Sequence, residues 1–285
     1  MQKEKRIIYQ LNSEFPRAMA DPPLLPNLAA RLQTLIDSLK TKHNITVTTA
    51  VIGPPATTSQ IREARKAARG YLPVGLEEFY SHVGFFRLEW RYTGPQILPH
   101  GYDEMPDWEK NMYKGDIPSA SVDIIPITEI FGGWKDVLWF PGDRDQDEED
   151  EEDEYDPNDP SFEEGVKATN GKEEEEEEEE EWRYTYQHLK PIDTFVPEAY
   201  TVLVGPKKKD KKGKFSDYVA YHYCGEELFH TRYTFAEYVE RMIVARGWWY
   251  WVTTLCGDRE RFEADSFKKL AVQIFEDIDL ALFVP

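Results

Sequence analysis

Cysteine is scarce in this chain: the 285 residues include only Cys224 and Cys256. Two thiols cannot build a disulfide framework, and their separation matches no spacing of metal ligands, which is typical of a protein in a reducing compartment. Long apolar runs are absent as well, since none approaches the ~18 residues that span a bilayer. The first residues also lack the apolar core of a signal peptide. We therefore expect a cytoplasmic protein that does not contact a membrane.

Catalytic signatures are missing too. The sequence contains no GxSxG, GxxxxGK(S/T) or GxGxxG motif, and its six histidines show no HExxH or HxH spacing. A partial calcium-loop pattern exists, with Asp143, Asp145, Asp147 and Glu154 at positions 1, 3, 5 and 12. The sixth position of such a loop turns sharply and is normally glycine, but here it is Glu148. We predict no catalytic residue, no cofactor and no formed metal site.

Negative charge is what the chain has in excess, and it lies in one stretch. The net charge is −20. Residues 143–181 contain 23 acidic and three basic residues, so that they alone carry −20. Subtracting them from the 54 acidic and 34 basic residues of the chain leaves 31 of each, and the rest of the protein is neutral. Because the stretch is acidic and poor in apolar residues, we predict a disordered insertion.

Three uses of this insertion are open. It could occupy a basic cleft of a partner in place of a phosphate backbone, steer a basic partner toward the fold, or fold back onto the lysine-rich loop 207–214. The first two uses make its acidic residues candidate partner-binding residues, and we expect no direct binding of nucleic acid. The candidates are Asp145, Asp147, Glu148, Glu149, Asp150, Glu151, Glu152, Asp153 and Glu154.

Hydrophobic periodicity outside the insertion predicts both helices and strands. The expected helices cover residues 27–40, 58–69, 74–83, 235–246 and 266–275, and the expected strands cover 45–52, 85–92, 200–204 and 217–223. Thr234 and Glu237 have the spacing of a capping box, and Gly247 is placed to cap the helix that follows them. The order of these elements predicts the α+β class. We expect an N-terminal arm over 1–26 and a single domain over 27–285 that is interrupted by 143–181.

Three short motifs resemble the SUKH superfamily, which includes the fungal cell-wall regulators of the Smi/Knr type and many bacterial immunity proteins. The first is GYLPVGLEEFY at 70–80, with Leu72, Pro73, Leu76 and Phe79, which runs on to Gly84 and Trp90. The second is IPITEIF at 125–131 followed by Trp134, which is similar to the family's middle strand and turn. The third is YTFAEYV at 233–239, with Phe235, which is similar to its C-terminal helix.

The resemblance implies a mixed or antiparallel sheet flanked by helices, and a binding function. Two departures stand out: Val83-Gly84 replaces the family's common asparagine-glycine, and neither the insertion nor the helix at 27–40 belongs to the minimal unit. Independently of any family, Leu72, Leu76, Phe79, Trp90 and Trp134 are expected to pack in a core, with Pro73 fixing the turn before a helix.

The resemblance also implies candidate partners. Bacterial SUKH proteins generally sequester a cognate toxin, so the first hypothesis is a non-enzymatic immunity protein whose acidic insertion helps to engage a basic toxin surface. The alternative is a regulatory or scaffold protein of the Smi/Knr kind, with the insertion as a recruitment or solubility segment. A second candidate binding face is the aromatic run that contains Trp248, Trp249 and Trp251. The same run is also typical of a core strand, because alternate members of a strand face inward.

Overall fold

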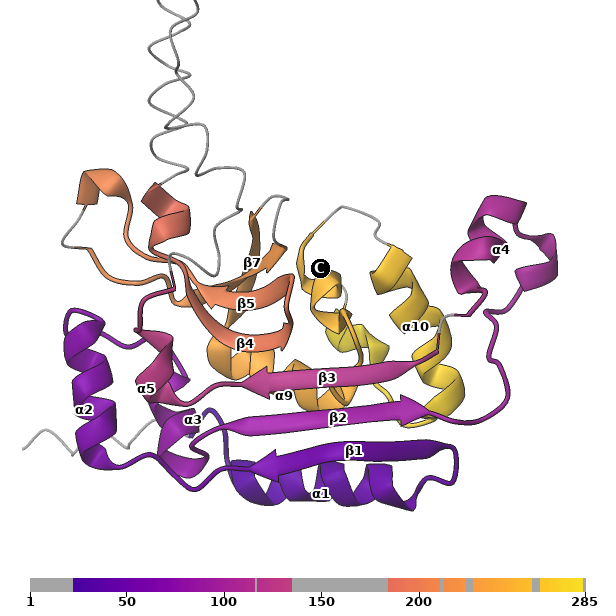
Figure 1. Ribbon diagram of the computed structural model, residues 1–285, viewed down its shortest axis with the longest axis horizontal. Coiled ribbons are helices and arrows are strands. Elements are labelled where there is room, and N and C mark those ends of the chain that lie inside the picture. Colours follow the sequence, from indigo (N-terminus) through magenta and orange to yellow (C-terminus); the bar gives the residue numbers. More distant parts are fainter. Residues whose placement is uncertain are drawn as a thin grey trace, which may run out of the picture.

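The computed structural model describes residues 23–115, 117–134, 184–210, 213–223, 228–257 and 262–283. The predicted α+β class is confirmed, because this part of the chain forms one seven-stranded sheet with helices packed around it (Figure 1). Each strand pairs antiparallel with the next strand in sequence. In order they are β1 (Ile45–Ile52), β2 (Phe86–Tyr92), β3 (Ser119–Ile124), β4 (Lys190–Val196), β5 (Ala199–Leu203), β6 (Tyr218–Tyr223) and β7 (Leu228–Thr234).

The helices lie around this sheet, and α4 stands away from it at one end (Figure 1). One cluster of buried side chains extends from Leu25 to Phe283, so the N- and C-terminal elements share a core. The helices are α1 (Leu28–Thr41), α2 (Thr58–Ala67), α3 (Leu76–His82), α4 (Asp107–Tyr113), α5 (Ile127–Ile130), α9 (Phe235–Ala245) and α10 (Phe262–Ile274). Short 3-10 turns occur at Tyr102–Glu104, Lys208–Asp210, Trp251–Leu255 and Leu280–Phe283.

The first helix follows directly from its sequence pattern. The apolar residues that recur at three- and four-residue intervals are the ones that α1 buries, namely Leu28, Leu32, Leu35, Ile36 and Leu39. The helix lies along β1 (Figure 1). Just before it, the backbone N–H groups of Leu24 and Leu25 donate to the carboxylate of Glu78 on α3. The end of the expected arm is therefore fixed to the domain.

The residues of the first SUKH-like motif pack in the core, as their apolar character predicts. Leu76 and Phe79 are completely buried and Trp90 is 2% exposed, with its indole N–H donating to the carbonyl of Arg246. Leu72 and Pro73 are buried in the turn before α3, and Trp134 is half-buried, donating to the carbonyl of Glu129. These contacts give the motif residues a structural role.

Gly84 of the first motif lies just after helix α3, at a close approach of two backbone segments. Helix α3 already ends at His82, and Val83 is its C-cap. A side chain at Gly84 would place a Cβ 2.0 Å from the carbonyl oxygen of Pro54. Glycine is needed there because two backbone segments approach each other closely.

The end of α9 corrects the expectation for Gly247. The capping box of Thr234 and Glu237 is present and Phe235 is buried, as predicted. At the other end, the Gly247 N–H donates to the Met242 carbonyl, and the Arg246 N–H donates to the Ile243 carbonyl. This pair of hydrogen bonds is the Schellman pattern. Arg246, with φ 55°, takes the left-handed cap position, and Gly247 follows it with φ 65°.

The second SUKH-like motif does not form the expected strand. The middle strand β3 lies earlier, at Ser119–Ile124, and Ile127–Ile130 is the short helix α5. Pro126 has no N–H for a sheet ladder, and it stands where a helix begins. The expected strands at 200–204 and 217–223 do pair, as β5 and β6. The insertion 143–181, its predicted disorder and its candidate residues 145–154 lie outside the described residues.

Sheet pairing nearly stops between β3 and β4, where Ile124 and Asp193 are the only partners in register. Side chains complete the junction: the Ser121 hydroxyl donates to the Phe195 carbonyl at 2.5 Å, and the Asp193 carboxylate accepts from the Asp123 N–H at 2.8 Å. Beyond this junction β4, β5 and β7 turn away from the flat half formed by β1 to β3 (Figure 1).

Candidate functional site

The flat half of the sheet has one covered face and one polar face. Along β2, Phe86, Leu88 and Trp90 are buried, and the residues between them point to the other side and are exposed. Neighbouring strands continue this polar face in register, with Ser119 opposite Arg91 and Ser121 opposite Glu89. This alternation is that of an antiparallel sheet with one face on the core and one face open. The open face is defined by the outward residues of β1, β2 and β3.

A groove of about 580 Å³ runs across the open face. On the β1 side the hydroxyl of Thr49 donates to the carboxylate of Glu89 at 2.9 Å, and a bulge between Val47 and Thr49 adds Thr48 to the same face. The groove is therefore rich in hydroxyl groups and has one acidic and one basic residue. Its lining comprises Thr46, Thr48, Glu89, Trp90, Arg91, Thr93, Ser119, Ala120, Ser121, Val196 and Trp249.

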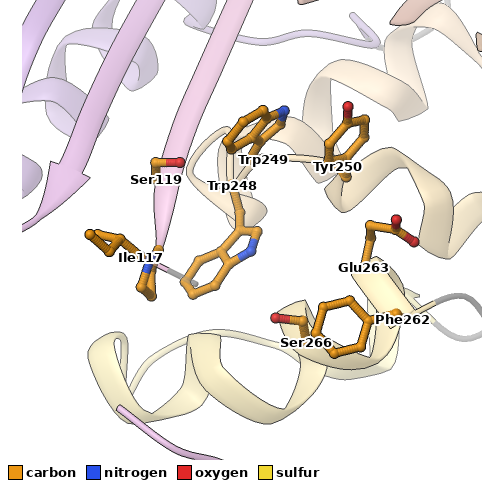
Figure 2. Close-up of a pocket in the computed structure, with 9 residues that line it drawn as sticks. Ile117, Ser119, Trp248, Trp249, Tyr250, Phe262, Glu263 and Ser266 are labelled. Carbon is orange, nitrogen blue, oxygen red and sulfur yellow. The ribbon is translucent and has the colours of Figure 1, made fainter. Parts of the chain in front are cut away.

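A smaller aromatic cleft of about 200 Å³ adjoins this groove. Figure 2 shows Trp248, Trp249 and Tyr250 on one side, the first turns of α10 on another, and the start of β3 on the third. The cleft and the groove share Ser119 and Trp249, so they adjoin each other at these two residues. The aromatic cleft is lined by Ile117, Pro118, Ser119, Trp248, Trp249, Tyr250, Phe262, Glu263 and Ser266.

Backbone geometry explains how the aromatic run forms one wall of the cleft. After α9 the chain reverses, and Trp248 bridges Ala120 while the N–H of Trp249 donates to the Ser119 carbonyl at 2.8 Å. Tyr250 then adopts φ 56°, and the 3-10 turn Trp251–Leu255 follows. The aromatic run therefore forms a turn that lies against the first residues of β3, and the expected core strand is not formed.

This geometry corrects the candidate binding face drawn from the sequence. Trp248 is 4% exposed and Trp251 is 3% exposed, because Trp248 packs on Trp90 and Phe267 and Trp251 packs on Tyr238. Trp251 lines neither hollow, whereas Trp248, although buried, contributes to the lining of the cleft. Trp249 is 42% exposed and lies where groove and cleft meet. It is the member of the run that a partner can reach.

Sequence reasoning missed the residues that surround Trp249. Ile117 precedes β3, Phe262 and Glu263 begin α10, and Glu198 lies in the β4–β5 turn. No local pattern connects these segments, since only the fold brings them together. Exposed apolar surface is the signal that locates the site: Ile117 is 52% exposed beside Trp249.

Carboxylates set the electrostatics at the aromatic cleft. The Tyr250 hydroxyl donates to Glu198 at 3.2 Å, and Glu263 lines the cleft itself. Burial raises the pKa of Tyr250 well above its ordinary value, and the charges of Glu198 and Glu263 raise it further. Among the described residues that line the cleft, none is lysine or arginine. Glu263 is thus the charged residue of this lining, and Glu198 adds a second carboxylate at the Tyr250 ring.

The most perturbed carboxyl group lies elsewhere. Asp193 is 1% exposed, and burial raises its pKa to about 7 although the Tyr238 hydroxyl, at 2.7 Å, and the Asp123 N–H donate to it. A shifted carboxyl can mark an active site. Asp193 lines neither the groove nor the cleft, and its contacts join β3, β4 and α9. In the described ranges no group of three or more potential ligands is arranged to hold a metal ion.

Segments that flank residues 135–183 contact segments that flank the lysine-rich loop 207–214. Phe131 packs edge-to-face on Phe215, just after the loop, with ring centroids 5.6 Å apart. The Lys190 ammonium donates to the Gly132 carbonyl at 3.0 Å. Gly205, just before the loop, lies against His188. The described residues before and after 135–183 therefore lie beside the two ends of the loop.

Comparisons with known proteins add no relative. No family model matches the chain, and neither a curated protein nor a solved structure matches it. The SUKH resemblance thus stays a prediction from three short motifs. Within the described residues, none of the helices has the length and apolarity that crossing a membrane would require.

Proposed function

We propose that this chain is a non-catalytic binding protein that sequesters a basic partner protein, in the manner of an immunity protein that neutralises a cognate toxin. The observation that carries the proposal is the pair of adjoining hollows, the groove on the open face and the aromatic cleft, with exposed Trp249 lining both. Aromatic residues at the centre of a polar surface are typical anchors of protein interfaces. The three SUKH-like motifs support the same class of function.

Charge supports the choice of a basic partner. The chain carries −20, and all of it comes from residues 143–181. A tethered polyanion raises the rate at which a basic protein arrives, whereas short-range contacts on the open face keep it bound. Because the Debye length is about 8 Å at physiological ionic strength, the steering component is expected to weaken at higher salt.

Growth rescue tests this proposal. An immunity protein is encoded beside its toxin, so the toxin-like C-terminal domain encoded immediately upstream is the partner to express. We expect the domain to arrest growth when it is produced alone and growth to recover when this chain is co-produced. An isolated gene, or continued arrest at matched expression, contradicts the immunity function.

A second candidate function is a regulator or scaffold of the Smi/Knr kind, in which the acidic insertion engages the chain's own lysine-rich loop. The contact of Phe131 with Phe215 favours it, because it joins the described segments that lead to the two charged stretches, and tethering raises the effective concentration of these stretches for each other. Replacing Lys207, Lys208, Lys209 and Lys214 with glutamine is then expected to change the NMR relaxation of residues 143–181. Unchanged relaxation excludes the internal contact.

A further inference from the structure

The aromatic cleft has the composition of a site for a cation. The rings of Trp249 and Tyr250 stack with centroids 5.4 Å apart and an interplanar angle of 11°. Tryptophan is the strongest aromatic partner of a cation, because its ring face is electron-rich. Trp249 lines the cleft (Figure 2) and is 42% exposed, so a ligand can approach its ring from solvent.

Two carboxylates lie at the cleft and can balance the positive charge of a cationic ligand. Glu263, on the first turn of α10, lines the cleft beside Tyr250 (Figure 2). Glu198 accepts the Tyr250 hydroxyl at 3.2 Å, which brings a second negative charge to the same ring. Burial is the main reason that the pKa of Tyr250 is raised, and the charges of these two carboxylates raise it further.

The size of the cleft restricts its ligand. Pockets for drug-sized molecules and cofactors begin at about 300 Å³. At about 200 Å³ the cleft is smaller than that, and it suits a single long side chain. The groove that joins it at Ser119 and Trp249 has about 580 Å³ and is lined by hydroxyl groups, which can bond the backbone of an extended segment.

We propose that the aromatic cleft binds an arginine or lysine side chain of a partner's basic segment, stacked on Trp249 and paired with Glu263, while the rest of that segment lies in the groove. The inference rests on the proposed function, since it names the chemistry by which the open face recognises a basic partner. Arginine is preferred over lysine, because a planar guanidinium stacks on an indole and donates two parallel hydrogen bonds to a carboxylate.

An NMR titration of the full chain tests the cleft without the partner. The probe is the capped peptide acetyl-Gly-Arg-Arg-Gly-amide, and acetyl-Gly-Gln-Gln-Gly-amide is its uncharged counterpart. The reporters are the backbone amides of Ser119 and Ser266, one on each side of the cleft, so that their shifts report on binding in the cleft itself. We expect saturable shifts with the arginine peptide, weaker binding of the equivalent lysine peptide, and none with the glutamine peptide.

Two variants and two matched controls locate the binding. Trp249→Ala and Glu263→Gln are each expected to raise the dissociation constant about fivefold or more, the range of a partly desolvated cation–π contact or ion pair. Trp108→Ala removes a tryptophan that is 67% exposed on α4, and Glu63→Gln removes one charge from exposed α2. Both controls are expected to bind like the wild type. The site is overturned if Trp249→Ala binds the arginine peptide as tightly as the wild type does. It is also overturned if Glu63→Gln loses as much affinity as Glu263→Gln.

The growth assay separates failure of this inference from failure of the proposed function. Peptide binding at the cleft without rescue contradicts toxin neutralisation and leaves the cation site standing. Rescue by Trp249→Ala and Glu263→Gln as complete as by the wild type, without peptide binding at the reporters, contradicts the cation site and leaves the function standing.

Discussion

Asp193 illustrates at the scale of one residue how the two halves of the sheet are joined. It is the only aspartate or glutamate among the described residues that is buried. One carboxylate oxygen accepts a hydrogen bond from the Asp123 N–H, and the other accepts one from the Tyr238 hydroxyl. The Tyr238 hydroxyl in turn accepts a hydrogen bond from the Thr201 hydroxyl. These bonds fix β4 against β3 and α9 where the ladder has almost stopped, at the cost of burying a carboxyl group.

The pKa of Asp193 gives a pH dependence whose sign is opposite to that of most aspartates. Its folded-state pKa of about 7 lies above the 3.8 of an unperturbed aspartate, so the folded state binds more protons between these pH values. The free energy of unfolding contributed by Asp193 is therefore greatest below pH 4 and falls as the pH rises toward 7, by at most about 1.4 kcal/mol per pH unit.

Urea unfolding of the wild type and Asp193→Asn at pH 5 and pH 8 measures this contribution. We expect the wild type to lose stability relative to Asp193→Asn as the pH rises, because the amide does not titrate. The difference between the two proteins isolates Asp193 from all other titrating groups. A difference that stays constant from pH 5 to pH 8 contradicts the shifted pKa.

The elements differ in how far their sequence predicts them. Helices α1 and α9 and strands β1 and β2 have clear periodicity and were predicted within a few residues of their bounds. Strands β4 and β7 and helix α4 were not predicted. In β4 the sequence KPIDTFV has Pro191 and Asp193 at buried positions, which hides the apolar alternation of a strand.

The aromatic run shows why the site was predicted only in part. Its exposed member Trp249 was among the candidates, but Trp248 and Trp251 were candidates too and lie in the core. Positive φ angles at Arg246 and Tyr250 set which ring points outward, and such angles are uncommon for non-glycine residues, so the sequence does not signal them. Glu198 and Glu263 join the site only through tertiary contacts.

The connection between α3 and β2 supplies a prediction at the scale of elements. In Gly84→Ala the new Cβ would meet the Pro54 carbonyl at 2.0 Å, and the loop before α2 or strand β2 has to move. We expect a loss of about 2–4 kcal/mol in the free energy of unfolding. Gly133→Ala is the matched control, because nothing lies within 4 Å of its Cβ. Equal stability of the two variants in urea contradicts the close approach.

The whole molecule combines a neutral fold with a separate polyanion. The fold carries 31 acidic and 31 basic residues, and the charge of −20 is carried by residues 143–181. Under the proposed function, long-range attraction of a basic partner would depend on the insertion, whereas contact specificity would depend on the open face and on Trp249 and Glu263 of the cleft. Raising the salt concentration is expected to slow association more than it speeds dissociation.

The central claim is that the open face holds the partner, and the affinity of one variant tests it most directly. Thr46→Arg places a long basic side chain in the groove from exposed strand β1, and Thr41→Arg places the same side chain at the exposed end of α1, outside the groove. The dissociation constant of each variant for the toxin domain of the growth assay is measured by calorimetry. We expect Thr46→Arg to bind about tenfold more weakly or worse, through blockage and like-charge repulsion, with Thr41→Arg unchanged. Equal affinity of both variants and the wild type contradicts the claim.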